Sequence, residues 1–315
     1  MERRKLIKLG NSSYAIALPK SWVTKSGLKK GDEIFVIPNS MGELILTQFN
    51  KKINEEKKIV INVDNKSEED INRDISSAYV KGYNLFYFIG KIDRDKSKII
   101  KKGIQYLLSI EVIEENSNNI IAKDFFNMED NNQESFIRRI DNNIREMFDL
   151  IETGYMKEKL SKIELGEINK VDDDINKFYF LSSRIMLKAM DSPALLTSMR
   201  TECVELFYRW WLCFNLEQIG DSIKQLATLV SKCGVNSKRF IDILSEIKNQ
   251  YVNSIEAFYK EDAGVAKNTI VNSFKTKEKL GKIKDNDVSK IITNNLESIR
   301  KATYQNAKMV LYLKI

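Results

Sequence analysis

Two acidic side chains in the second half of the chain have a spacing that could bind a cation. Glu217 and Asp221 lie four residues apart in the stretch NLEQIGDSIKQLA, whose apolar residues recur at helical spacing. Carboxylates one helical turn apart repel each other, but they can share a divalent or trivalent metal ion. Gly220 lies between them, and a glycine inside a helix costs about 1 kcal/mol relative to alanine. The alternative is a solvated helix flank on which Lys224 balances Asp221.

Other residues could be taken for parts of a site. Three acidic residues on neighbouring predicted helices could complete a metal site, and these are Asp141, Asp149 and Asp174. A second acidic pair, Asp70 and Asp74, has Arg73 beside it, so we interpret that pair as structural. The side chains of Trp210 and Trp211 point about 100° apart on a helix, which favours packing over a platform for stacking bases.

The excess positive charge of the chain is concentrated near its beginning. The 315 residues carry a formal net charge of +7. Residues 1–30 contain eight lysines and arginines against one glutamate, so this segment accounts for the whole excess. Such segregation predicts a surface that binds a polyanion, and the alternative is a solvated basic face.

The composition disfavours several classes of protein. The chain contains no histidine, which excludes Ser/His/Asp and Cys/His nucleophile systems and imidazole metal ligands. We therefore expect no enzymatic activity, and we find no glycine-rich phosphate loop that would indicate an organic cofactor. The three cysteines lack Cys-x-x-Cys spacing, and no signal peptide or membrane span is recognised. These features predict a soluble, cytoplasmic protein.

Two kinds of element precede the helical part of the chain. Residues 1–50 read as short strands around one turn of helix, and so small a piece needs the rest of the chain or a second copy to bury its apolar surface. Residues 51–126 alternate between strands and helices in the order βαβαββ, which predicts a small α/β module with its helices on one sheet face.

Helical periodicity follows a polar linker at 127–135 and continues to the end. We expect six helices in two sets of three, with Pro193 opening a long helix that runs through Val230. The two sets resemble each other. Alignment on Asn-Leu-Glu-x-Ile pairs Glu217 with Glu297, Gly220 with Arg300, and Asp221 with Lys301. The simplest interpretation is two three-helix bundles in tandem.

The motif LEQIGDSIKQLA at 216–227 resembles the signature of PhoU proteins, and the tandem of six helices resembles the architecture of that family. Paired acidic motifs bind metals on the bundle surface of PhoU proteins, so the resemblance implies that Glu217 and Asp221 are metal ligands. The second repeat departs from the pattern because Lys301 replaces the second acid. PhoU repeats often have an acidic residue shortly after the helix-opening proline, whereas Pro193 is followed by ALLTSMR, which contains no acid.

The segment RKLIKLGNSSYAIALPKSWVTKSGLKKGDEIFVI at 4–37 resembles the SpoVT-AbrB domain. The shared features are a basic first strand, a Gly-polar turn, Leu-Pro-Lys and Leu-x-x-Gly-Asp. The resemblance implies a dimeric barrel of swapped hairpins that binds DNA. The implied DNA contacts are Arg3, Arg4, Lys5, Lys8, Asn11, Ser12, Ser13 and Lys20. The chain departs from many AbrB domains at Val23, close to the position of their arginine.

Together the two resemblances are typical of phosphate uptake regulators best known in archaea. We expect a mainly α, multidomain protein with a swapped-hairpin β-barrel at 1–50, an α/β module at 51–126, and PhoU-like repeats at 130–232 and 236–315, the second with a degenerate motif. It would be a homodimeric, DNA-binding transcription regulator that senses phosphate status. The alternative is a signalling adaptor for a phosphate transporter or sensor, in which the AbrB-like domain serves only dimerisation.

Overall fold

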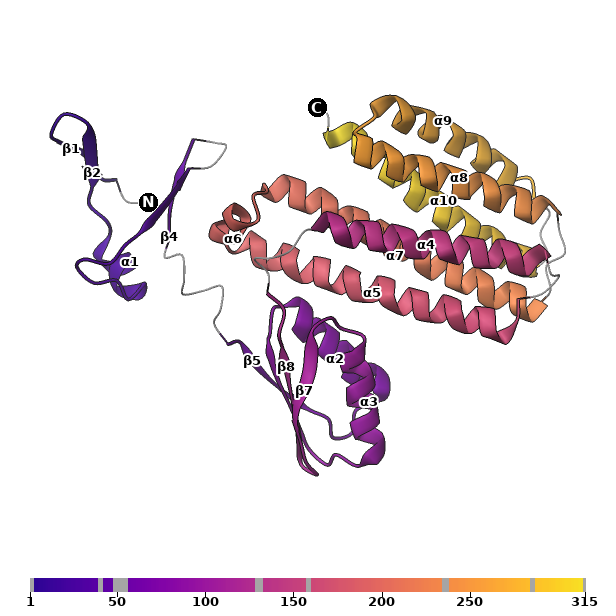
Figure 1. Cartoon of the computed structure of the whole chain (residues 1–315), viewed down its shortest axis with the longest axis horizontal. Coiled ribbons are helices and arrows are strands. Elements are labelled where there is room, and N and C mark those ends of the chain that lie inside the picture. The colour runs from indigo at the N-terminus through magenta and orange to yellow at the C-terminus, as the bar shows by residue number, and fades with distance from the viewer. Residues whose placement is uncertain are drawn as a thin grey trace. The chain divides into compact units, whose positions relative to one another are not determined.

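The computed structural model of the chain describes residues 3–38, 42–47, 56–127, 133–156, 160–233, 238–283 and 287–313. Its contacts divide the chain into two compact units, which we call unit 1 (residues 1–55) and unit 2 (residues 56–315). Figure 1 shows hairpins in unit 1, and a small sheet module joined to long helices in unit 2. The predicted fold class is confirmed, because the protein is mainly helical, with N-terminal hairpins, a middle sheet module and a C-terminal bundle.

Unit 1 consists of two hairpins and one short helix. Strands β1 (Leu6–Leu9) and β2 (Ser13–Ile16) are antiparallel, as are β3 (Phe35–Pro38) and β4 (Leu44–Thr47). Helix α1 (Lys20–Lys25) lies between the hairpins in the chain and begins after Pro19. Gly10 opens the first turn with φ +67°, a left-handed conformation that glycine adopts without strain.

The middle module of unit 2 has the predicted βαβαββ order. Its elements are β5 (Lys58–Asn62), α2 (Glu68–Val80), β6 (Leu85–Ile89), α3 (Arg94–Gln105), β7 (Ile110–Glu115) and β8 (Asn119–Asp124). The strand order in the sheet is β5-β6-β8-β7, with β5 parallel to β6 and the other pairs antiparallel. Helices α2 and α3 cover one face of this sheet (Figure 1), as predicted.

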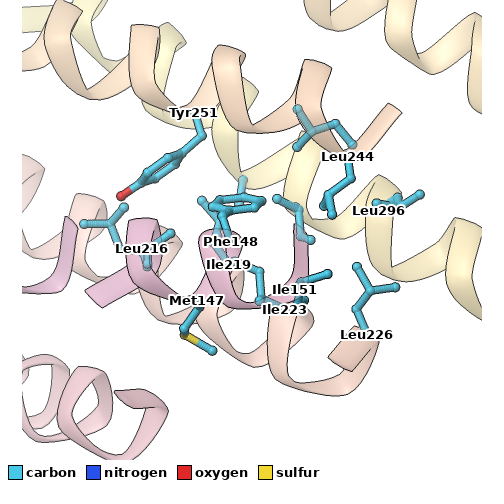
Figure 2. Packing of buried hydrophobic residues seen from close by; sticks show 14 of the residues in the cluster. Met147, Phe148, Ile151, Leu216, Ile219, Ile223, Leu226, Leu244, Tyr251 and Leu296 are labelled. Atoms are coloured by element: carbon cyan, nitrogen blue, oxygen red, sulfur yellow. The ribbon is translucent and has the colours of Figure 1, made fainter. Parts of the chain in front are cut away.

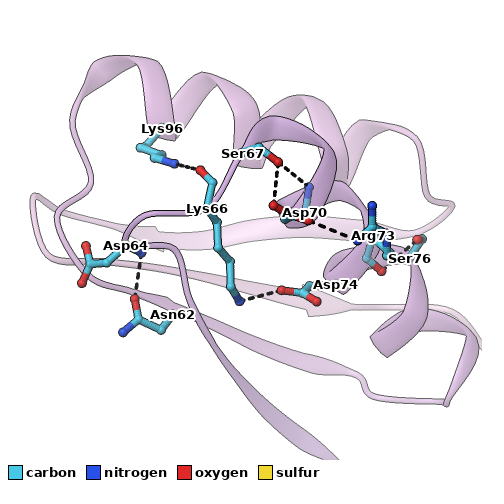
Figure 3. A network of polar contacts seen from close by, with 9 residues as sticks. All are labelled: Asn62, Asp64, Lys66, Ser67, Asp70, Arg73, Asp74, Ser76 and Lys96. Atoms are coloured by element: carbon cyan, nitrogen blue, oxygen red, sulfur yellow. Dashed lines mark hydrogen bonds and ion pairs between the residues drawn. The ribbon is translucent and has the colours of Figure 1, made fainter.

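Polar contacts fix the start of α2 and use both acids of the Asp70 and Asp74 pair (Figure 3). The Ser67 hydroxyl accepts the Asp70 backbone N–H and so caps the helix. Asp70 accepts a hydrogen bond from Arg73 at 3.1 Å, and Asp74 accepts one from Lys66 at 2.6 Å. Each carboxylate therefore has its own cation, which agrees with the structural interpretation of this pair.

The helical part of unit 2 consists of α4 (Gln133–Met156), α5 (Lys162–Met190), α6 (Pro193–Ser198), α7 (Cys203–Cys233), α8 (Lys238–Lys260), α9 (Ala263–Leu280) and α10 (Asp287–Leu313). The expectation of one helix from Pro193 to Val230 is wrong, because α6 ends after two turns. Arg200 adopts φ +51°, and the N–H groups of Arg200 and Thr201 donate to carbonyl groups of α6, which closes the helix in a Schellman motif. No helix in the described ranges is long and apolar enough to cross a membrane.

One continuous apolar core joins the two sets of helices. Figure 2 shows side chains of this core from four helices, among them Met147 and Phe148 of α4, Ile219 of α7, Tyr251 of α8 and Leu296 of α10. A second core joins the sheet module to the bundle, because side chains of α5, α6 and α7 pack with those of β5, β6 and α2. Trp211 packs on the first core and Trp210 on the second, and the Trp210 indole N–H donates to Ser183 Oγ at 2.9 Å.

The buried hydroxyl of Tyr251 connects α8 to α4, and removing it should weaken the bundle. It donates to Asp141 Oδ1 at 2.7 Å, and the Arg145 Nε–H donates to the same oxygen at 2.9 Å. Tyr251→Phe should lower the free energy of unfolding by about 1–3 kcal/mol, because a buried carboxylate loses one of its donors. The matched change Tyr304→Phe keeps its ring contact with Phe274 and should cost less than about 0.5 kcal/mol in the same denaturant titration.

Candidate nucleic-acid interface and carboxylate cluster

The side chains predicted to contact DNA all lie on the surface of unit 1. The structure places Arg3, Arg4 and Lys5 before β1, Lys8 within it, Asn11 and Ser12 in the turn, Ser13 at the start of β2 and Lys20 at the start of α1. All eight are exposed. The acidic residues described in unit 1 follow later, at Asp32, Glu33 and Glu43. The first hairpin and α1 therefore carry only positive formal charges among their described side chains.

Unit 1 also exposes half of the large apolar side chains that the structure describes in it. None of its described residues is buried. The large apolar side chains on its hairpins that are 44–67% exposed are Leu6, Ile7, Leu9, Tyr14, Ile16, Phe35, Val36 and Leu44. Both faces of the first hairpin contribute, because Leu6 and Ile7 alternate along β1. Apolar surface of this extent marks an interface with another chain or domain.

Gly220 lets two long helices approach closely in unit 2. A Cβ atom at Gly220 would lie 3.1 Å from Ile175 Cδ1 and 3.6 Å from Asp172 Oδ1, both on α5. The loss of intrinsic helix propensity at Gly220 is therefore offset by the packing of α5 on α7. This contact also brings Asp172 to the two acids of α7.

The charge of Lys224 is directed to α5 and not to Asp221. Lys224 Nζ lies 2.6 Å from Asp172 Oδ2, and the Asp172 side chain is 2% exposed. One interpretation of the sequence is that Lys224 balances the charge of Asp221. In the structure Lys224 pairs with Asp172 instead, but it is close enough to Asp221 to lower the pKa of that carboxyl group. Burial outweighs that effect and raises the pKa of Asp221, with the Asp172 charge adding to the rise.

Glu217 is the most strongly perturbed acid of this group. Burial raises its pKa from the usual 4.5 to about 7, and the charges of Asp221 and Asp172 add to the rise. Its carboxylate accepts a hydrogen bond from the Gln218 side-chain amide at 2.8 Å, which lowers the pKa and so acts in the opposite direction. Near neutral pH this carboxyl group is therefore divided between its neutral and ionised forms.

Asp221 lines a cavity of about 350 Å³ where the middle module meets the bundle. The wall is formed by α2, α3, α5 and α7, and it includes Arg73, Tyr106, Asp173 and Phe180. Burial raises the pKa of Asp173 as well. The carboxylate cluster therefore lies at a junction between two parts of unit 2.

The structure does not bring the other predicted metal ligands to this cluster. Asp141 bonds to Tyr251 and Arg145, Asp149 to Lys248, and Asp174 to Lys177. Within the ranges that the structure describes, no group of three or more acidic or cysteine side chains could hold a metal ion. Glu217 and Asp221 would supply two carboxylates beside the cationic Lys224, so the donor set fits a metal poorly. Metal binding by this pair stays a prediction.

In the second repeat, Glu297 corresponds to Glu217 and has a cationic partner on its own helix. The guanidinium of Arg300 donates to both oxygens of Glu297, at 2.6 and 2.7 Å, and also to Ser273 Oγ on α9. Arg300 occupies the position that aligns with Gly220. The second repeat thus pairs its acid with a cation from the same helix, whereas the first repeat leaves room there for α5.

Sequence reasoning missed Asp172 and Asp173 as members of the cluster. A signal was present, because the acidic run at 172–174 lies between Ile168 and Ile175, which both face the core. That helical frame turns Asp172 towards the buried side.

A change at Glu217 should reveal its perturbed pKa. The folded state keeps this carboxyl protonated up to about pH 7, while the unfolded state ionises near 4.5, so the wild type should lose stability as the pH rises from 5 to 8. Glu217→Gln is neutral at every pH and should be more stable than the wild type by about 1–2 kcal/mol at pH 8, with little difference at pH 5. Urea titrations at both values measure this. Glu297→Gln should lower the free energy of unfolding at both pH 5 and pH 8, because it leaves Arg300 without its carboxylate partner.

Comparison with known proteins gives one family match, and it lies in the N-terminal segment. Residues 7–58 match the family MazE_antitoxin, described as antidote-toxin recognition MazE, bacterial antitoxin. This match supports the AbrB-like interpretation of the segment and covers less than half of the chain. Comparison with curated proteins and with solved structures finds no match.

Proposed function

We propose that the protein is a homodimeric, DNA-binding transcription regulator in which unit 1 both dimerises and contacts DNA. The observation that carries this proposal is the surface of unit 1, where exposed apolar strands occur beside a purely basic first hairpin and α1. A second copy would cover the apolar side chains, and it would double the number of basic residues at one surface. The similarity of residues 7–58 to the MazE family supports the same conclusion.

The proposed roles follow from the chemistry of the eight predicted side chains. Arg3, Arg4, Lys5 and Lys8 supply phosphate contacts, which give most of the affinity and make it dependent on salt. The turn residues Asn11, Ser12 and Ser13 have hydrogen-bonding groups that suit phosphates or base edges. Lys20, at the beginning of α1, adds a further phosphate contact.

The role of the helical repeats rests on their resemblance to PhoU proteins. We infer that they sense phosphate status and pass it to unit 1, and that components of a phosphate transporter or sensor are their partners. Glu217 lies in the carboxylate cluster at the junction of sheet module and bundle, and its pKa is raised to about 7, so its charge responds near neutral pH. In the competing adaptor function, the same repeats bind the partner and unit 1 serves only dimerisation.

A second candidate function follows from the description of the matched family. An antitoxin would use part of the chain to bind and neutralise a toxin, and its DNA binding would control its own gene. The family name favours this candidate, and a small toxic protein that copurifies with the full chain would distinguish it from the regulator.

The experiment that tests the proposed function is genome-wide immunoprecipitation of the tagged, full-length protein. The regulator requires discrete enriched sites, and sensing of phosphate requires that they include phosphate transport loci. Enrichment should vanish when Arg3, Arg4, Lys5 and Lys8 are all changed to Gln. Absence of enriched DNA together with recovery of a transporter or sensor component would contradict DNA regulation and favour the adaptor.

A further inference from the structure

The middle module leaves one face of its sheet uncovered by any described element of unit 2. Helices α2 and α3 pack on the face that contains Ile61, Phe86 and Phe88. On strands the side chains alternate, so the opposite face presents Val60 and Ile89, which are 60% and 40% exposed. Ile113, in the bulge of β7, is 52% exposed. We call this side of the sheet the open sheet face, and its side chains are those of the three rows given in the next paragraph.

The strand register arranges the open sheet face in rows that cross the sheet. The first row is Lys58, Leu85, Lys123 and Glu111, from β5 through β6 and β8 to β7. The second row is Val60, Tyr87, Ile121 and Glu114, with Ile113 beside it in the bulge. The third row is Asn62, Ile89 and Asn119. A mainly apolar row thus lies between a charged row and a row dominated by amides.

The charged row has opposite signs at its two ends, and Glu56 pairs with its two lysines, at 3.7 Å from Lys58 and 3.0 Å from Lys123. Lys58 lies on the β5 edge and Glu111 on the β7 edge, and both are exposed. Consider a two-fold axis that runs parallel to the strands, between β6 and β8, above the open face. This axis places the β5 edge of one sheet over the β7 edge of the other sheet. Each row of one sheet then lies over the same row of the other sheet. Lys58 then faces Glu111 of the second copy and Leu85 faces Lys123. In the next row Val60 faces Glu114 and the adjacent Ile113, and Tyr87 faces Ile121.

We propose that the open sheet face binds a second copy of this chain, with the two sheets packed face to face about this two-fold axis. The arrangement puts the mainly apolar rows together and places Lys58 opposite Glu111 twice, once on each side of the axis. Such self-complementarity is required of a surface that forms a two-fold dimer. Strands that run nearly parallel in facing sheets, with the sheets about 10 Å apart, are the common geometry of sheet packing.

The connection between the units favours this occupant over an unrelated partner. Eight residues, 48–55, separate the described end of β4 from the start of unit 2, and such a segment spans at most about 30 Å. A dimer formed through unit 1 therefore holds two copies of unit 2 close together, at an effective concentration of about millimolar. This part of the argument rests on the proposed function, since it assumes that unit 1 dimerises.

Cross-linking of the full-length protein tests the proposal. In a Cys203→Ser, Cys233→Ser background, Lys58→Cys and Glu111→Cys are introduced together and each alone, and a short bismaleimide is added. Facing sheets bring residues 58 and 111 of different copies about 10 Å apart, whereas two copies of residue 58 are separated by the width of the sheet as well. The double variant should give at least tenfold more covalent dimer than either single variant. The matched pair Glu69→Cys and Asp95→Cys, on the helical side of the module, should give as little as the single variants.

Light scattering on the same samples separates this proposal from the proposed function. A dimer in which the double variant cross-links preferentially supports the two-fold sheet contact. The sheet contact is overturned if the protein is a dimer but the double variant cross-links no better than the matched pair. It is also overturned if the single variants cross-link as well as the double variant. Either result leaves dimerisation by unit 1 standing. A monomer overturns both. Protection of the two cysteines from maleimide without covalent dimer would mean that unit 1 of the same chain covers the sheet, which also overturns the proposal.

Discussion

Replacing Arg184 by methionine should lower the free energy of unfolding by about 3–5 kcal/mol, because it leaves a buried carboxylate without its partner. Arg184 lies on α5, and its guanidinium is 2.5 Å from Asp124 Oδ2 at the end of β8. The side chains of both residues are almost completely buried. The pair therefore joins the bundle to the sheet module within a dry environment.

Arg184 also completes the end of α2. It donates to the backbone carbonyl groups of Tyr79 and Tyr83, at 2.9 and 2.8 Å, and its guanidinium lies over the Tyr79 ring. Carbonyl groups in the last turn of a helix have no partner within the helix, and a cation at that end is favourable. Methionine fills part of the same space but supplies none of these donors.

The pH dependence of the Arg184→Met variant provides an internal check. Burial already raises the pKa of Asp124, and the guanidinium opposes the rise. Without Arg184 the pKa rises further, so the carboxyl group takes up a proton as the pH falls and its burial then costs less. The loss measured by urea unfolding should shrink from pH 8 to pH 5. Adding Asp124→Asn should recover part of the stability at pH 8, and an equal loss in both variants at both pH values would contradict the role of the ion pair.

Removing the four basic side chains that lie just before β1 and within it should abolish most of the DNA affinity. A variant with Arg3, Arg4, Lys5 and Lys8 all changed to Gln loses four charges per chain and eight per dimer. Each lost phosphate contact should reduce the salt dependence of binding by about one unit of slope, and the affinity at low salt should fall at least about 100-fold. Fluorescence anisotropy with labelled duplex DNA measures both quantities.

A charge-matched variant distinguishes the hairpin from the general charge of the protein. Four exposed lysines of α9 and the turn after it, in unit 2, serve this purpose when changed to Gln: Lys267, Lys275, Lys277 and Lys282. Their loss changes the net charge by the same amount and should alter the affinity by less than about threefold. Equal losses in the two variants would mean that DNA is attracted without a defined site on unit 1.

The elements with strong local signals could be predicted from the sequence. The βαβαββ order of the middle module and the long amphipathic helices follow from periodicity and from caps such as Ser67 and Asp93. The break after α6 could not be predicted, because the left-handed conformation of Arg200 occurs at a residue with no turn signal. Local propensity at that point is overridden by the way α5, α6 and α7 pack.

The candidate site was predictable only where its residues are close in the chain. Glu217, Gly220 and Asp221 share one motif, and their spacing indicated a functional or packing role. Asp172 joins them from 45 or more positions away, and Arg184 meets Asp124 across 60 positions. Such pairs depend on how helices and sheet pack, and periodicity states which side of a helix is buried but not which partner it meets. The basic segment of unit 1 was visible because its charges are contiguous.

The most direct test of the central claim is the salt dependence of DNA binding by the full-length protein. We expect a dimer that neutralises about 6–10 phosphates, so the affinity measured by fluorescence anisotropy should fall by about 10³-fold or more between 50 and 200 mM salt. An affinity that stays constant over this range, or the absence of binding at 50 mM salt, would contradict the claim that unit 1 is a DNA-binding surface.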